Sequence, residues 1–246
     1  MSDAHEPSPL DPAKLVFATL SDPGRVRPEN QDAAALLNNV SNERLAVVAD
    51  GMGGHRGGET ASKLCIDTLG RIFRDPHGTP EERLRRGLEL ANEEVYSAAL
   101  SNPELKGMGT TAVALLFGAG TRGVWLAWVG DSRCYRLRGG TLKQLTVDHT
   151  LAGAGIKGRN AGVLVRALGV EKSVEVDVMV EAPLPGDVYL LCSDGLTRMV
   201  SAEEIEKILR QTPDLQEATN KLVECANAEG GKDNITAVLA RIAPAS

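Results

Sequence analysis

The most informative stretch of this sequence is Leu45-Ala46-Val47-Val48-Ala49-Asp50-Gly51, an apolar run that passes directly into an aspartate and a glycine. Five consecutive apolar residues that end at turn-forming residues are typical of a buried β-strand. Two further runs end in the same way, at Val129-Gly130-Asp131 and at Cys192-Ser193-Asp194-Gly195. Because the ends of core strands can meet at one edge of a sandwich, we expect these aspartates to lie together.

Apolar runs and amphipathic stretches alternate in blocks along the rest of the chain. The predicted strands are Leu15–Leu20, Leu45–Ala49, Thr111–Phe117, Val124–Val129, Val174–Val180, Val188–Cys192 and Ile235–Ile242, with a hairpin formed by Cys134–Leu137 and Thr141–Leu145. One pair of helices is predicted after the second of these runs and another pair after the sixth. Grouped helices favour an antiparallel α+β sandwich over a doubly wound parallel sheet.

Capping signals place the predicted helices. Thr79-Pro80-Glu81-Glu82 combines an N-cap hydroxyl, a proline at the first helical position and the glutamate of a capping box. Ser201 and Glu204 have the same capping-box spacing, and Thr212-Pro213 is predicted to open the last helix. The first helix is predicted from one apolar face, which carries Ala61, Leu64, Cys65, Thr68 and Ile72.

Composition excludes several classes of function. The chain has 246 residues, and its 27 Lys and Arg against 33 Asp and Glu leave a formal net charge of -6. This balance excludes electrostatic attraction to nucleic acid or to an anionic membrane as the main activity. The longest apolar run, Ala112–Phe117, is far too short to span a bilayer. Four widely spaced cysteines without zinc-binding spacing indicate a reducing compartment, so we expect a cytoplasmic protein.

No internal repeat, long linker or block of charge divides the chain, so residues 13–244 are predicted to form one domain. Residues 1–12 are acidic and rich in proline and serine, without the apolar segment of a signal peptide. We expect this segment to be a disordered tail and the protein to be a monomer.

Five aspartates at predicted strand ends are candidates for chemistry: Asp32, Asp50, Asp131, Asp194 and Asp233. A single Asp-Gly after a strand is usually just a turn. Two carboxylates about 5 Å apart, however, repel by roughly 3 kcal/mol at an effective dielectric constant of 20. A cluster of them therefore needs cations, and oxygen ligands without histidine or cysteine suit Mg²⁺ or Mn²⁺. Arg27, five residues before Asp32, could hold two phosphate oxygens in its planar fork.

Eight short motifs between residues 21 and 239 carry these residues: Arg27…Asn30-Gln31-Asp32, Val48-Ala49-Asp50-Gly51-Met52-Gly53-Gly54-His55, Gly109-Thr110-Thr111, Val129-Gly130-Asp131-Ser132-Arg133, Leu145-Thr146-Val147-Asp148-His149, Arg166-Ala167-Leu168-Gly169, Leu191-Cys192-Ser193-Asp194-Gly195-Leu196 and Asp233-Asn234-Ile235-Thr236. In this order and spacing they resemble the metal-dependent serine/threonine protein phosphatases, the protein phosphatase 2C family, in its bacterial branch. The resemblance implies an αββα sandwich of two antiparallel β-sheets flanked by pairs of antiparallel helices.

The resemblance also implies a centre of two Mn²⁺ or Mg²⁺ ions, with a position for a third. Asp50 would bridge both ions, and the carbonyl of Gly51 would bind one of them. Asp194 and Asp233 would complete the shell of the other ion, and Asp131 would bind the third ion together with Asp194. Asp32 would complete the implied set of metal ligands, and it would contact the ions mainly through water.

The activity implied by the resemblance is hydrolysis of phosphoserine and phosphothreonine in proteins by a metal-bridged hydroxide. Arg27 would bind the phosphoryl group, and His55 would act as the general acid for the leaving alkoxide. An equal alternative for His55 is a loop histidine that closes the glycine-rich turn. The implied partners are phosphorylated proteins and a cognate serine/threonine kinase.

The chain departs from the family pattern at two places. Gln31 stands where many members carry a glutamate, so one acidic group beside the metals is missing. Residues 150–163 are expected to form a flap shorter than is usual in the bacterial branch, and their glycine content predicts that they hold no helix.

Two alternative functions remain open from the sequence. One is a pseudo-phosphatase that acts as a regulatory binding module, and the other is a metal-dependent phosphoesterase of small molecules. The intact set of aspartates argues against a binding-only protein, because that function has no need of such repulsion. The fold alone does not decide the substrate.

Overall fold

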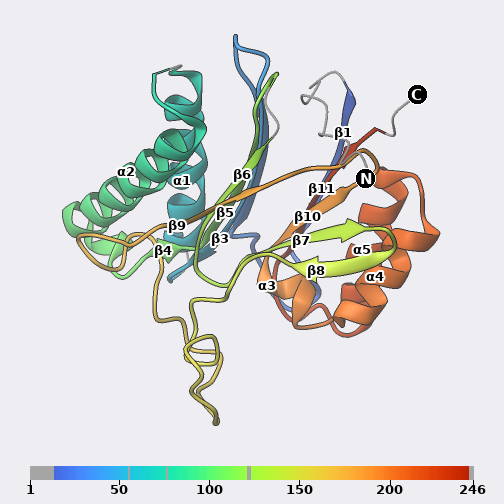
Figure 1. Ribbon diagram of the computed structural model, residues 1–246. Helices are drawn as coiled ribbons and strands as arrows, with labels where there is room; N and C mark the ends of the chain where they lie inside the picture. The colour runs from blue at the N-terminus through green and yellow to red at the C-terminus, as the bar shows by residue number, and fades with distance from the viewer. Residues whose placement is uncertain (1–13, 55, 76, 121–122, 244–246) are drawn as a thin grey trace.

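The computed structural model describes residues 14–54, 56–75, 77–120 and 123–243. Within this part of the chain, the strands form two antiparallel sheets that lie face to face (Figure 1). The first sheet has the order β1-β11-β10-β7-β8, with bounds Leu15–Asp22, Ile235–Ile242, Val188–Cys192, Arg133–Arg138 and Thr141–Gln144. The second has the order β2-β3-β5-β6-β9, with bounds Asp32–Asn38, Arg44–Met52, Ala112–Phe117, Val124–Val129 and Asp177–Glu181, and the short β4, Gly109–Thr110, pairs with β3.

Helices cover the outer face of each sheet, as Figure 1 shows. On the second sheet lie α1, Gly57–Arg74, and α2, Pro80–Ser101, which is followed by the 3₁₀ turn η2, Pro103–Leu105. On the first sheet lie α3, Asp194–Thr197, α4, Ala202–Gln211, and α5, Leu215–Ala228. The predicted αββα sandwich is therefore confirmed. None of the helices in the described part of the chain combines the length and apolar content that a membrane span requires.

Three apolar layers hold the sandwich together. The central layer lies between the sheets, where the ring of Phe117 meets Tyr189 edge-on at a centroid distance of 5.9 Å. The other two layers lie between each sheet and its helices, and they include Leu88 of α2 and Leu222 of α5. Strand β5 is buried along its whole length because both faces of its sheet are covered, which explains its unbroken apolar run.

The hairpin predicted around Gly139-Gly140 is confirmed, with Leu137 of β7 opposite Leu142 of β8. Both glycines have positive φ values, 56° and 84°. A two-residue turn of this kind has the twist that antiparallel neighbours require, and glycine adopts it without strain.

Helix boundaries agree with the sequence at Thr79 and differ from it at α5. Thr79 closes the expected capping box with Glu82. The prediction that Thr212-Pro213 opens the last helix is wrong: Thr212 ends α4, with its N–H bonded to the carbonyl of Ile208. Asp214 caps α5 instead, because its carboxylate accepts the N–H of Glu217 at 2.8 Å. The predicted tail, residues 1–12, lies outside the described residues.

Candidate active site

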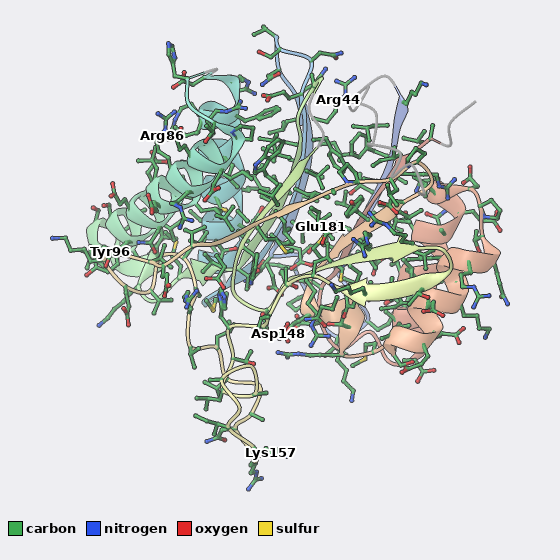
Figure 2. The ribbon with its side chains drawn as sticks, viewed as in Figure 1. Arg44, Arg86, Tyr96, Asp148, Lys157 and Glu181 are labelled. Atoms are coloured by element: carbon green, nitrogen blue, oxygen red, sulfur yellow. The ribbon has the colours of Figure 1, made fainter. Side chains whose placement is uncertain are left out.

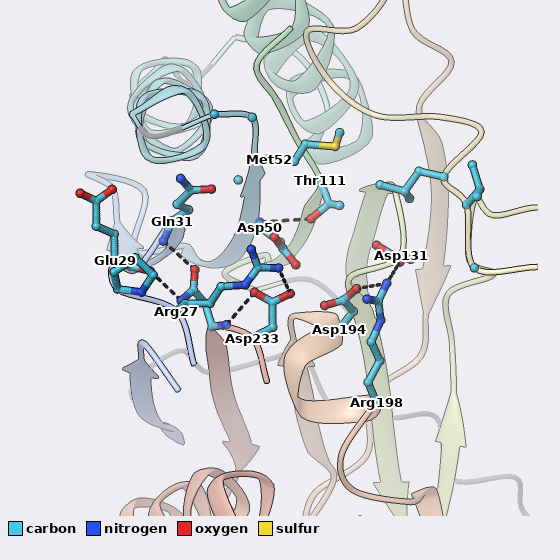
Figure 3. Close-up of a pocket in the computed structure, with 18 residues that line it drawn as sticks. Arg27, Glu29, Gln31, Asp50, Met52, Thr111, Asp131, Asp194, Arg198 and Asp233 are labelled. Carbon is cyan, nitrogen blue, oxygen red and sulfur yellow. Dashed lines mark hydrogen bonds and ion pairs between the residues drawn. The ribbon is translucent and has the colours of Figure 1, made fainter. Parts of the chain in front are cut away.

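Strand ends from both sheets meet around one pocket of about 640 Å³. Asp50 lies near the end of β3, Asp131 lies where the chain passes from β6 to β7, Asp194 follows β10, and Asp233 precedes β11. Figure 3 shows these carboxylates and Arg27 around the same space. Of the predicted site residues, the pocket is lined by Arg27, Asp50, Gly51, Asp131, Asp194 and Asp233.

The two remaining predicted residues are not part of that lining. Asp32 lies opposite Asp50, which lines the pocket, in the register of β2 and β3. His55 falls outside the described residues, so its role stays a prediction from the sequence.

Backbone contacts hold the Asp50-Gly51 turn in place. The N–H of Asp50 donates to the Thr111 hydroxyl at 3.1 Å, and the carbonyl of Asp50 accepts the N–H of Thr111 at 2.9 Å. Gly51 lies so close to α1 that a Cβ atom there would come within 2.1 Å of the carbonyl oxygen of Gly58. Only glycine therefore fits at position 51, and the main chain can approach the pocket without a side chain between them.

Asp32 connects the strands that carry the other carboxylates. Its Oδ2 accepts hydrogen bonds of 2.7 Å from the hydroxyls of Ser193, which precedes Asp194, and Thr236, which lies three residues after Asp233. Its Oδ1 is buried without a hydrogen-bond partner. Burial raises the pKa of Asp32 to about 6, although these two hydrogen bonds lower it. A buried carboxylate oxygen without a partner fits a role in holding a water or an ion.

The pocket carboxylates are poorly compensated. Burial raises the pKa of Asp50 well above its usual range, and the charges of Asp32 and Asp194 raise it further. Burial, followed by the charge of Asp131, raises the pKa of Asp194 to about 7. Burial also raises the pKa of Asp131. This donor set consists of oxygens and is compensated only in part, which fits hard divalent cations such as Mg²⁺ or Mn²⁺.

Two arginines stand among these carboxylates. Arg27 contacts Asp233, with an Nη2–Oδ2 distance of 2.8 Å. Arg198 lies 2.5 Å from Oδ2 of Asp194 and 3.7 Å from Oδ2 of Asp131. In the part of the chain that the structure describes, no three acidic, histidine or cysteine side chains are already close enough to form a coordination shell. The donors thus surround the pocket, and the guanidinium groups occupy places between them.

Arg198 was missed from the sequence, although its position four residues after Asp194 was a usable signal. Residues four apart share one face where the chain turns helically, and α3 begins at Asp194. Ser193 and Thr236 were also missed, because a hydroxyl beside a strand end has no pattern that distinguishes it from any surface serine or threonine.

His149 holds the loop that carries Asp131. The ring Nδ1 of His149 accepts the backbone N–H of Gly130 at 3.0 Å. The backbone N–H of His149 in turn donates to the carbonyl of Gly130 at 3.0 Å. The ring stacks on Trp128, and its Nε2 lies 3.2 Å from Asp177. Burial lowers the pKa of His149, which favours the neutral ring that this acceptor role requires. His149 therefore has a structural role in this loop.

Gln31, the residue expected to weaken the acidic surroundings of the metals, lines the pocket. Its carbonyl accepts the N–H of Gly51 at 3.2 Å and the hydroxyl of Ser62 at 2.7 Å. Its N–H donates to the side-chain oxygen of Asn234 at 2.8 Å. The backbone of Gln31 therefore ties α1 and the start of β11 to the Asp50-Gly51 turn.

Residues 150–163, all of which the structure describes, contain turns and no helix, as predicted. A bridge between Thr150 and Leu164 closes the base of this segment. Figure 2 shows Lys157 at the tip, which points away from the sheets. The pocket is also lined by the last two residues of this segment, Gly162 and Val163, and by the next residue, Leu164.

The chain matches the family model described as protein phosphatase 2C over residues 26–240, and it belongs to that family. It is 39% identical over 235 residues to the serine/threonine phosphatase stp of Listeria welshimeri, a match that covers 89% of this chain and 92% of the relative.

Solved structures agree with this assignment. The Mycobacterium tuberculosis serine/threonine phosphatase PstP/Ppp superposes with a TM-score of 0.83 at 38% identity and covers 93% of this chain and 99% of that one. The catalytic domain of the serine/threonine protein phosphatase PstP in complex with two manganese ions superposes with a TM-score of 0.81 at 38% identity, over 93% and 98% of the two chains.

Proposed function

We propose that this protein hydrolyses phosphoserine and phosphothreonine in other proteins, with two Mn²⁺ or Mg²⁺ ions in the pocket and a place for a third. The observation that carries the proposal is the set of buried, poorly compensated carboxylates at converging strand ends, with Arg27 beside them. Membership of the family supports the same activity.

The carboxylates have distinct roles in this proposal. Asp50 and the carbonyl of Gly51 would hold the ions from the end of β3, and Asp194 and Asp233 would hold them from the ends of strands in the first sheet. When bound, the ions supply Lewis acidity, which polarises the phosphoryl oxygens and lowers the pKa of water. Asp32 keeps these groups in register, because its Oδ2 already bonds Ser193, next to Asp194, and Thr236, three residues after Asp233. Asp131, beside Asp194, would contribute to the place for a third ion.

Arg27 binds the phosphoryl group in this proposal. Its guanidinium is already held over the pocket by Asp233, and its remaining N–H groups can donate to two phosphate oxygens. Those bonds strengthen as charge builds on the equatorial oxygens in the transition state. We assign the proton for the leaving alkoxide to His55 from its place in the motif alone.

A second hollow favours a protein substrate over a small phosphoester. It has a volume of about 580 Å³ and continues from the first pocket, since Met52 and Leu164 line both. Val170 and Val174 give it apolar walls, and Glu171 lies among the residues that line it. A peptide chain on either side of the phosphorylated residue could occupy this space, whereas a small ester would leave it empty.

The biological setting is proposed on the same basis. We infer a bacterial signalling protein of the cytoplasm, active as a monomer, that reverses the action of a cognate serine/threonine kinase. The dispersed cysteines, all of them free, motivate the location.

The test is a comparison of substrates in the presence of Mn²⁺. A phosphothreonine peptide should be hydrolysed with a kcat/KM well above that of nucleotides or sugar phosphates, and the Asp194→Asn variant serves as the inactive control. Equal or better hydrolysis of the small esters would indicate a small-molecule phosphoesterase. Binding of the phosphopeptide without turnover would indicate a regulatory binding module.

A further inference from the structure

Arg198 occupies the position between two buried carboxylates of the site. Its Nη2 lies 2.5 Å from Asp194 and 3.7 Å from Asp131. The two acidic side chains are only 12% and 8% exposed, whereas that of Arg198 is 54% exposed. The guanidinium of Arg198 thus contacts the two acids from the solvent side. Because these acids are buried, water cannot hydrate them fully.

The other arginine near these two acids, Arg133, already has a partner. A hollow of about 170 Å³ contains both acids, and Arg133 and Asp148 also line it. Arg133 is committed to Asp148, with hydrogen bonds of 2.7 Å and 2.9 Å. Among the described residues, Asp131 and Asp194 are the acids with which Arg198 forms ion pairs.

We propose that Arg198 is the resident cation of the Asp131–Asp194 pair, so that a divalent cation reaches this pair only by displacing the guanidinium. The inference rests on the proposed function of the site. It makes this chain a two-ion phosphatase in which a side chain takes the place open to a third ion. With Asp194 bound to an ion in the main pocket, Arg198 would still have Asp131 as its partner.

The physical reason is that burying Asp131 and Asp194 side by side destabilises the folded protein. Two acids that share one small hollow repel each other and lose hydration, so the folded protein needs a positive charge there. A guanidinium on the same chain supplies this charge at every metal concentration. A free divalent ion must compete with it and must also release the arginine into water.

Arg210 provides a matched control. It forms an ion pair at 3.6 Å with Glu206, with the same spacing of four residues, and its side chain is 58% exposed. The variants Arg198→Gln and Arg210→Gln therefore remove the same charge from similar ion pairs. Only the first variant leaves a buried pair of acids uncompensated.

The first experiment counts Mn²⁺ ions bound to the full chain by calorimetric titration and by the electron paramagnetic resonance signal of free Mn²⁺. Wild type and Arg210→Gln should bind two ions, and Arg198→Gln should bind a third. Arg198→Lys keeps the charge and should also bind two. Equal numbers and affinities in wild type and Arg198→Gln would overturn the proposal.

The second experiment needs no metal. In excess chelator, Arg198→Gln should unfold roughly 2–4 °C below wild type, and Arg210→Gln should not. Adding Asp131→Asn to Arg198→Gln should recover most of the loss, since the repulsion is then gone. A double variant as unstable as Arg198→Gln alone would overturn the proposal. If wild type binds no Mn²⁺, the proposed function fails in the first experiment, while this cycle still tests the role of Arg198.

Discussion

The Arg83–Glu43 ion pair and the carboxylates of the pocket both place negative charge inside this protein, but they are compensated in opposite ways. Arg83 reaches Glu43 from α2 with two parallel hydrogen bonds of 2.7 Å, and Asn39 donates a third. Burial alone would raise the pKa of Glu43, but the bonds from Arg83 and Asn39 outweigh it and lower that pKa. The pair is therefore a closed structural unit.

The pocket has the opposite balance. Asp50 has a pKa well above its usual range because it is buried among other carboxylates, and no arginine of the described chain pairs with it. The arginines that do approach the site, Arg27 and Arg198, are more than half exposed. A compensated charge stabilises the fold, whereas an uncompensated one is available to a ligand and destabilises the empty protein.

Removal of divalent cations tests this contrast with the largest expected effect. Hydrolysis of an aryl phosphate should fall to background in excess chelator and return with Mn²⁺ or Mg²⁺. Ca²⁺ should not restore it, because its larger and more flexible coordination suits the site poorly. Initial rates measured over a titration of each ion check this prediction. Full activity in the chelator would show that the carboxylates work without metal.

The Asp50→Asn variant should break the site without harming the fold. Loss of one ligand charge should lower kcat by roughly a thousandfold. In metal-free buffer the variant should be as stable as wild type or more stable, because repulsion among the carboxylates falls. Steady-state kinetics and thermal unfolding measure the two effects. A variant that is both active and destabilised would reverse the roles assigned to the two regions.

The Glu43→Gln variant is the complementary change in the closed pair. It should lower the free energy of unfolding by about 3 kcal/mol, because Arg83 stays charged and buried without its counter-ion. Folded enzyme should keep its kcat. Since the pKa of Glu43 is lowered by folding, its contribution is present above the unfolded pKa, near 4.5, and is lost as pH falls. Urea unfolding at pH 7 and at pH 4 should show a smaller difference from wild type at the lower pH.

Leu164→Ala, at the junction of the two hollows, should have the smallest effect. It should lower kcat/KM for phosphothreonine peptides several-fold and leave an aryl phosphate unchanged, because only a long substrate reaches the second hollow. The control is Ile156→Ala, in the half-exposed outer part of residues 150–163. An equal loss on both substrates would show that Leu164 acts through the catalytic pocket, which it also lines, and not through the second hollow.

Local patterns in the sequence were sufficient for most of the architecture. The apolar runs predicted the main strands, because burial of a strand on both faces requires an unbroken apolar stretch. The capping box at Thr79 marked the start of α2, because it depends on neighbours only three residues apart. The boundary of α5 was missed where two residues on either side of Pro213, Thr212 and Asp214, could each act as a cap.

The sequence by itself determined which residues could carry chemistry: aspartates at the ends of apolar runs, and an arginine among their motifs. Only the tertiary structure decided which of these charges are compensated. Asp50 and Asp194 are far apart in the chain, and so are Asp32 and Thr236, yet they share one strand-end cluster. Burial and proximity shift a pKa, and both depend on which strands become neighbours, a property that no local pattern of residues contains.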